Sequence, residues 1–321
     1  MKTKLAFAAL LSIMSNADAS CASSYCTVNT QWDTQGLRNN DGLRIDLRYT
    51  YAKADTPRLG SAKVVNDPAL AAPGDEVENL QTLNQSLIAN FNYALNHQWN
   101  MDVGVPLVMR DHAHTIAPAT IEQNKFSRLG DIRIVGNYQT DAADALSGNG
   151  LRLGLKLPTG QTSWELVPGG GAAERSLQPG SGSTDVILGA YQYREAAHSP
   201  WGWFVSGQIQ AALNTRDNYR AGNDIAIDLG AHYTVSPKLT ALLQLNTQFK
   251  QRDSGINANL HSGGHSVNLN PGLSFALTDK ARVYGFVQLP LYQYANTDPA
   301  GGLSGQLTAP WSASLGISRQ F

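Results

Sequence analysis

The chain has 321 residues, of which 42% are hydrophobic and 15% are charged, and its formal net charge is −1. No stretch approaches the ~20 consecutive apolar residues that a membrane-spanning helix needs, which excludes a helical membrane protein. A net charge this close to zero also provides no basic surface for binding nucleic acid. The low charge and the 30 glycines are typical instead of a β-protein whose surface does not face water everywhere.

The first residues, 1–19, have the features of an export signal. A lysine pair near the start is followed by an apolar core over residues 5–14 and by Ala17-Asp18-Ala19, a small-x-small cleavage sequence. We therefore expect the mature chain to begin at Ser20. Cys21 raises the alternative of a lipoprotein, but Asp18 stands where a lipidation signal has an aliphatic residue.

Apolar and polar residues alternate down most of the remaining chain. In the first such segment Leu43, Ile45 and Leu47 alternate with charged residues, which predicts a strand with one apolar and one charged face. The twelve expected strands span 42–51, 80–95, 99–109, 130–139, 150–158, 184–193, 202–214, 223–234, 239–250, 266–277, 281–293 and 307–321. Several reach about ten residues, the length that a tilted strand needs to cross a bilayer, whereas strands of soluble sandwiches average about five or six.

The connections between these segments alternate in length. Long stretches, such as 52–79, 110–129 and 159–183, alternate with short links, such as 96–98, 235–238 and 278–280. Long loops at one end and short turns at the other are typical of bacterial outer-membrane barrels. The last strand also closes on an aromatic residue, Phe321, which resembles the signal that the outer-membrane assembly machinery reads. We therefore predict an all-β protein, a transmembrane antiparallel up-and-down β-barrel of about 12 strands over residues 42–321, located in the bacterial outer membrane.

If the apolar positions meet lipid, the alternation assigns the polar positions to the barrel interior. A water-filled interior explains how charged side chains persist at membrane depth, where each would otherwise cost about 2–4 kcal/mol. The ionisable candidates for the lumen lining are Arg44, Asp46, Arg48, Asp102, Asp131, Arg133, Arg152, Lys156, Asp185, Asp228, His232 and Arg282. Two roles stay open for each of them, contact with a solute or cross-strand pairing that only fills the interior.

The segment between the signal and the barrel, residues 20–41, contains both cysteines of the chain. Cys21 and Cys26 most simply form a disulfide, because the protein is exported to an oxidising compartment. The alternative is a redox-active or copper-binding pair, although no third and fourth ligands stand nearby. The polar segment either enters the lumen as a plug or extends into the periplasm.

Four histidines suggest a weaker metal site. His112 and His114 fall in the second expected outer loop, and His261 and His265 fall in the fifth. If the two loops met over the barrel mouth, the four imidazoles would suit Zn or Cu. The alternative is that each histidine lies in a solvated loop without a ligand, and we predict no required cofactor.

The sequence offers no arrangement typical of catalysis. No Gly-x-Ser-x-Gly elbow accompanies His232, and the aspartates of the strands show no spacing that selects a catalytic pair. The glycines at 169–171 lack the Lys-Ser/Thr of a phosphate-binding loop. We therefore expect a protein that is not an enzyme, with no catalytic residues.

Several motifs resemble those of outer-membrane proteins in the meta-pathway phenol-degradation family. They are Gly130-Asp131-Ile132, Gly154-Leu155-Lys156-Leu157-Pro158-Thr159-Gly160, Gln178 to Ser183 followed by Asp185, Pro271-Gly272-Leu273, Tyr284 to Tyr292, and Gly316 to Phe321. The resemblance covers about 42–321 and implies an outer-membrane barrel that transports aromatic or other hydrophobic compounds.

The function expected from these features is passive or facilitated passage of a small solute through the barrel. Its expected partners are outer-membrane lipid, the assembly machinery and the solute itself. One alternative is a structural barrel that holds a periplasmic redox or metal partner through Cys21 and Cys26. A second alternative is a surface adhesin that acts through its long loops.

Overall fold

The computed structural model describes residues 42–65, 76–116, 120–140, 146–165, 171–259, 261–297 and 305–321. The expected export signal, the segment 20–41 and both cysteines lie outside these residues. In the described part of the chain, no helix is long and apolar enough to cross a membrane.

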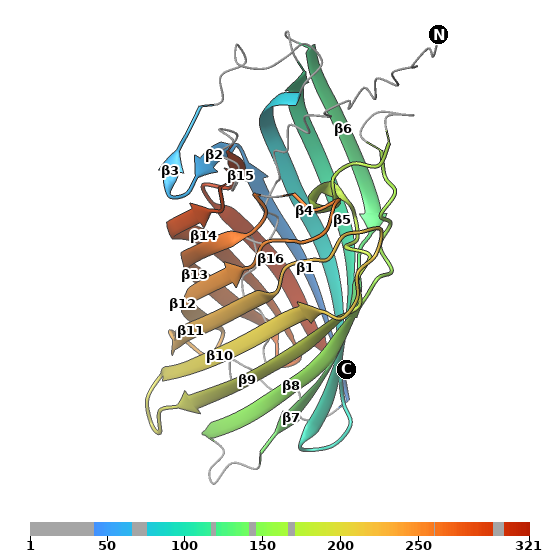
Figure 1. Cartoon of the computed structure of the whole chain (residues 1–321). Coiled ribbons are helices and arrows are strands. Elements are labelled where there is room, and N and C mark those ends of the chain that lie inside the picture. The colour runs from blue at the N-terminus through green and yellow to red at the C-terminus, as the bar shows by residue number, and fades with distance from the viewer. Residues whose placement is uncertain are drawn as a thin grey trace, which may run out of the picture.

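The described strands form one closed antiparallel barrel (Figure 1). In chain order its strands are β1 (Leu43–Ala54), β4 (Glu76–Ala94), β5 (Trp99–Ile116), β6 (Thr120–Leu129), β7 (Ile132–Gln139), β8 (Ser147–Leu157), β9 (Asp185–Glu195), β10 (Trp201–Ala212), β11 (Asp224–Thr234), β12 (Leu239–Lys250), β13 (Gly264–Thr278), β14 (Ala281–Ala295) and β16 (Ser312–Gln320). Strand β1 pairs with β4 on one side and with β16 on the other, which closes the wall. Strands β6 and β7 pair with successive halves of β5 and so count as one strand of the wall. The prediction of an all-β barrel of about twelve strands is confirmed.

The predictions of two long loops are wrong in part, because strands continue into the segments expected to form them. Residues 110–129 form a hairpin in which β5 and β6 pair as far as Ile116 and Thr120. Strand β4 likewise begins at Glu76, inside the loop expected over 52–79. Apolar alternation could not reveal these extensions, because strands that project beyond the lipid need no apolar face.

A second, smaller sheet lies at the long-loop end of the barrel (Figure 1). It consists of β2 (Thr56–Leu59), β3 (Ala62–Lys63) and β15 (Gln306–Thr308). In this sheet β2 pairs with both β3 and β15, which ties two of the long loops to each other. The opposite end has the short links that the sequence predicts, closed by backbone hydrogen bonds from Leu95 to Trp99 and from Val235 to Leu239, each 2.9 Å long.

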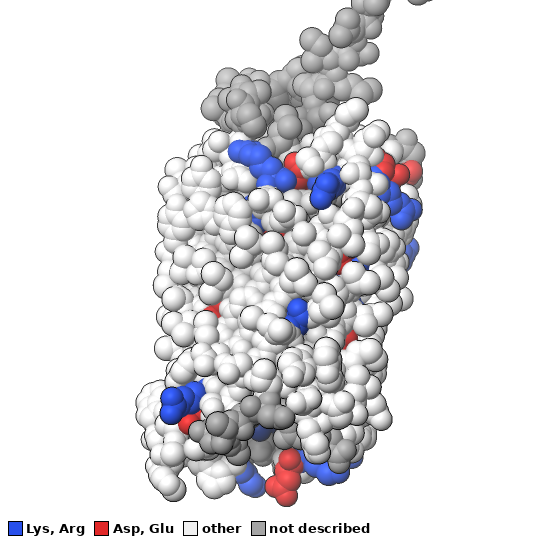
Figure 2. Space-filling model, turned by 60° about the horizontal axis from the view of Figure 1, so that its bottom comes forward, with Lys and Arg blue, Asp and Glu red and all other residues white. Residues whose placement is uncertain are grey.

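The outer face of the barrel is apolar between two aromatic zones. Leu151 and Leu153 on β8 are 60% and 63% exposed, values that suit side chains in contact with lipid. At the short-turn end Trp99 packs on Tyr138, with ring centroids 4.9 Å apart. At the long-loop end Tyr51 and Trp311 stack at 5.6 Å, and the charged side chains on the face drawn in Figure 2 gather toward the two ends of the molecule.

The inner face carries five aromatic rings that lie opposite glycines. The pairs, each directly opposed in the strand register, are Tyr191 with Gly150, Tyr193 with Gly148, Phe204 with Gly230, Phe286 with Gly272 and Tyr284 with Gly316. All five rings are at least nine-tenths buried and lie near the short-turn ends of their strands. A Cβ atom on any of these glycines would overlap the facing ring. Because glycine has no side chain, it leaves room for each ring to lie flat against the neighbouring strand.

Candidate functional site

The barrel encloses a cavity of about 520 Å³, which we call the lumenal cavity. It lies in the size range of small-molecule sites. Ten of the twelve predicted lumen residues line it: Arg44, Asp46, Arg48, Asp102, Asp131, Arg133, Arg152, Lys156, Asp185 and Asp228. The period of two along each strand was thus sufficient to place these side chains inside the barrel.

The other two predicted lumen residues lie away from this cavity. His232 is buried and its Nε2 lies 3.0 Å from Glu195 Oε2, near the short-turn ends of β9 and β11. Arg282 lies at the beginning of β14, within electrostatic range of Arg44. Both positions face inward, but neither lines the lumenal cavity.

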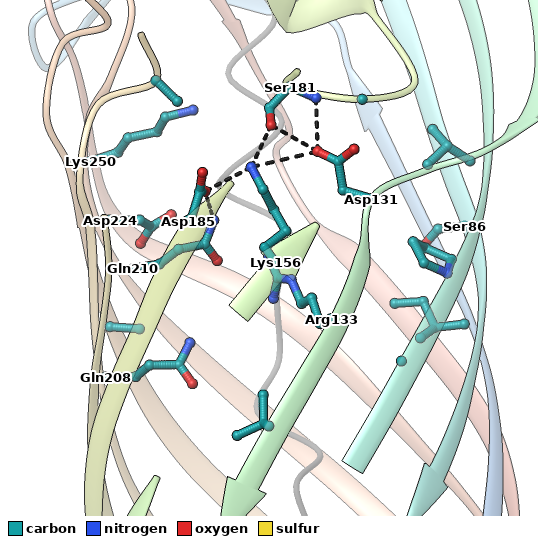
Figure 3. Close-up of a pocket in the computed structure, with 18 of the residues that line it drawn as sticks. Ser86, Asp131, Arg133, Lys156, Ser181, Asp185, Gln208, Gln210, Asp224 and Lys250 are labelled. Carbon is teal, nitrogen blue, oxygen red and sulfur yellow. Dashed lines mark hydrogen bonds and ion pairs between the residues drawn. The ribbon is translucent and has the colours of Figure 1, made fainter. Parts of the chain in front are cut away.

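Lys156 is the centre of a charged cluster at the long-loop end of the cavity (Figure 3). Its Nζ lies 2.7 Å from Asp185 Oδ2 and 3.5 Å from Asp131 Oδ2, and it also donates a hydrogen bond to Ser181 Oγ. The side chains of both aspartates are less than a tenth exposed. One ammonium group thus faces two buried carboxylates, and the Arg133 guanidinium on β7 lies within electrostatic range of both carboxylates.

Asp131 also holds the segment between β8 and β9 against the barrel wall. Its carboxylate accepts hydrogen bonds from the Ser181 amide at 2.9 Å, the Ser181 hydroxyl at 2.8 Å and the Gly160 amide at 3.0 Å. Gly160 and Gly180 approach so closely that a Cβ on Gly160 would lie 2.6 Å from Gly180 Cα. The three motifs around Gly130, Gly154 and Gln178 therefore meet at one place, where they fix this connection.

The same connection narrows the cavity on its long-loop side. Arg175, Ser176 and the stretch 178–181 all line the lumenal cavity. Ser176 accepts a hydrogen bond at 2.6 Å through its backbone oxygen from the Arg110 guanidinium on β5. The connection is thus attached at two neighbouring places on the wall, by Asp131 before β7 and by Arg110 on β5.

Residues of the loops after β10 and β12, among them Tyr219 and Asp253, also line the cavity. Arg175 pairs with Asp217 at 3.0 Å and lies over the Tyr219 ring, 5.2 Å from its centroid. Burial, and after it the Asp253 carboxylate, raises the pKa of Tyr219 above its ordinary value, so its hydroxyl stays protonated and hydrogen bonds to Asp253. Asp253 also accepts a hydrogen bond of 2.8 Å from the Gly222 amide, which joins the loop after β10 to the loop after β12.

Sequence reasoning missed several charged residues that line the cavity. Asp224 and Lys250 stand at the ends of β11 and β12, in phase with the inward positions, so the alternation could have found them. Arg110, Arg175 and Asp253 fall in segments that the sequence assigned to loops, where the alternation gives no signal.

The four histidines of the predicted metal site do not come together. His112 and His114 lie on the inner face of β5, not in a loop, and their rings are 5.3 Å apart. His261 is buried before β13, whereas His265 stacks on Tyr294 at 4.7 Å among the outer aromatic side chains. Over the described ranges, no three His, Cys, Asp or Glu side chains are arranged to hold a metal ion.

A closed antiparallel barrel with an apolar outer face and a charged lumen defines the class of outer-membrane β-barrels. No family model matches the chain. The COG4313 outer membrane channel from Pseudomonas putida F1 has a similar structure, with a TM-score of 0.63 at 13% sequence identity over 88% of this chain and 97% of that one. This similarity is one of fold.

Two further structures are similar at lower TM-scores. The β domain of the Bordetella autotransporter BrkA gives 0.48, at 12% identity over 88% of this chain and all of that one. The toluene transporter TodX of Pseudomonas putida gives 0.46, at 9% identity over 94% and 96% of the two chains. At these scores the two similarities carry no argument about the present chain.

Proposed function

We propose that this protein is an outer-membrane channel for a small solute and not an enzyme. The observation that carries the proposal is a charged cavity inside a closed barrel whose outer face is apolar. A lumen of this kind selects solutes by its width and by the field of its side chains. The similarity in fold to the COG4313 channel supports this proposal, and the resemblance of several motifs to those of the phenol-degradation family is in keeping with it.

Planar-bilayer conductance of the refolded protein tests this function. We expect stable current steps from the intact chain, or from a variant lacking residues 20–41 if that segment acts as a plug. Heat-modifiable migration in gels provides the control that the barrel is folded. Absence of current from both proteins, when folded and inserted, would contradict the channel and favour the adhesin.

The rival proposal, a barrel that holds a redox or metal partner, depends on the two cysteines. We expect the double variant Cys21→Ser, Cys26→Ser to conduct within about 20% of the unmodified protein, because the described strands of the wall begin at Leu43, after both cysteines. The measurement is single-channel conductance with and without a reductant. Loss of conductance in the variant, or its abolition by the reductant, would favour the rival.

A further inference from the structure

The lumenal cavity contains more cationic than anionic side chains. Eight Lys and Arg residues line it, against seven Asp and no Glu. An excess of one positive charge is small, so selectivity depends on which charges are already paired. The partners of the individual side chains decide that question.

The carboxylates of the cavity are held largely by neutral donors. Asp228 accepts hydrogen bonds from Gln244, Asn246 and Ser206, at 2.8, 2.7 and 3.2 Å. Both oxygens of Asp224 lie within 3.2 Å of Gln248 Nε2. None of these hydrogen bonds comes from a guanidinium group, although Lys250 and Arg133 also attract Asp224 electrostatically.

Two guanidinium groups, those of Arg48 on β1 and Arg133 on β7, lack such partners. In the described part of the chain neither guanidinium group makes a hydrogen bond. Neither lies within 4.0 Å of a carboxylate, so neither forms an ion pair. The Nε of Arg48 is buried and has no hydrogen-bond acceptor, while Arg133 is exposed to the lumen. Asp224, Asp185 and Asp131 attract the Arg133 guanidinium electrostatically, whereas Arg48 repels it. A buried N–H without an acceptor is costly, and an anion that accepts a hydrogen bond from the Arg48 Nε would remove that cost.

The strand register places an apolar surface between these two arginines. Arg48 lies opposite Ile88, which in turn lies opposite Pro106 on β5. Arg133 lies opposite Gly104, two residues before Pro106 on the same face of β5. Ile88, Gly104 and Pro106 all line the lumenal cavity, and the Asn90 side chain lies close against Gly104.

Resting on the proposed channel function, we infer that Arg48 and Arg133 form a binding site for small organic anions that carry an apolar body. The carboxylate of such a solute accepts hydrogen bonds from the guanidinium groups, and its apolar part lies on Ile88 and Pro106. Arg133 and Lys156 point into the cavity from the neighbouring strands β7 and β8 (Figure 3), and Lys156 is already bound to Asp185. Arg133 is therefore the cation of this pair that remains available to the solute.

Block of the bilayer current by benzoate tests the site, with benzamide as the uncharged match and formate as the match without a ring. We expect benzoate to block at a concentration at least tenfold below that of either control compound. In the double variant Arg48→Gln, Arg133→Gln the half-blocking concentration of benzoate should rise at least tenfold. The reversal potential in a KCl gradient should shift toward cation selectivity. The matched control is Arg128→Gln, which removes an exposed arginine of β6 outside the cavity and should leave the block unchanged.

The outcomes separate the site from the channel. Current that benzoate and benzamide block equally, or benzoate block that survives in the double variant, overturns the anion site and leaves the channel intact. Absence of current in folded protein overturns the channel and the site with it. If the glutamine variants do not fold, Arg48→Lys and Arg133→Lys keep the charge but lose the two-pronged hydrogen bond. We then expect an intermediate rise of about threefold in the half-blocking concentration, and no rise would overturn the site.

Discussion

Replacing Asp131 with alanine is expected to raise the single-channel conductance severalfold. The Asp131 carboxylate accepts three hydrogen bonds from Gly160 and Ser181, and these hold the connection between β8 and β9 beside the cavity. Hydrogen bonds to a charged group contribute about 1.5–3 kcal/mol each, so their loss frees the connection from this part of the wall. Because residues of the connection line the cavity, its release widens the path for ions.

Limited proteolysis of the same variant provides an independent measurement. We expect cleavage between residues 158 and 184 in Asp131→Ala under conditions that leave the unmodified protein intact, since protease sites open where a loop loses its attachments. The matched control is Asp111→Ala, which removes an aspartate whose side chain accepts a hydrogen bond only from Gln123 among the described side chains, 2.8 Å away on the β5–β6 hairpin. Equal conductance and equal protection in the two variants would show that Asp131 does not hold the connection.

The fold could be predicted from the sequence where one side of a strand meets lipid. On β8 the residues Leu151, Leu153 and Leu155 alternate with Arg152 and Lys156, and the structure places the leucines outside and the charges inside. On β9 both faces are apolar, so the sequence did not decide that Ile187 and Tyr191 face inward while Leu188 faces outward. A period of two specifies orientation only where the two faces differ in polarity.

The sequence predicted which residues line the barrel interior, but it did not predict which of them contact one another. Nothing in the spacing of Asp131, Lys156 and Ser181 indicates that they meet, because contact between them depends on how the connection between β8 and β9 returns to the wall. The sequence also does not show that Arg48 and Arg133 lack direct partners. That depends on which side chains donate hydrogen bonds to the aspartates in the closed barrel. Charge pairing is a property of the closed barrel, in which strands distant in sequence face one another.

The structural role of the glycines opposite aromatic rings is likewise evident only from the register in which the strands pair. Gly150 and Gly316 belong to segments that the sequence identified as strands, where glycine usually weakens pairing. In the structure Tyr191 and Tyr284 lie over them, and the Tyr284 hydroxyl donates to both Asp46 oxygens at 2.9 Å. The ring at Tyr284 thus links β14 across β16 to β1, on both sides of the seam where the barrel closes.

Substituting Gly150 with alanine is therefore expected to prevent most of the protein from forming the heat-resistant barrel. The added Cβ would overlap the Tyr191 ring, which is only 4% exposed. Overpacking in a filled interior costs about 1–3 kcal/mol, a large fraction of a marginal stability. The measurement is the fraction of refolded protein that migrates as the compact form in unheated gel samples, together with the midpoint of urea unfolding.

Two further variants separate this overlap from a general cost of removing glycine from a strand. Gly207→Ala, on the outer face of β10 opposite the exposed Ile227, should fold as the unmodified protein does, because no atom lies within 4 Å of its added Cβ. The double variant Gly150→Ala, Tyr191→Ala should recover part of the lost stability, since the ring that opposes the new methyl group is absent. Equal losses in Gly150→Ala and Gly207→Ala, with no recovery in the double variant, would mean that strand propensity and not ring packing selects glycine at these positions.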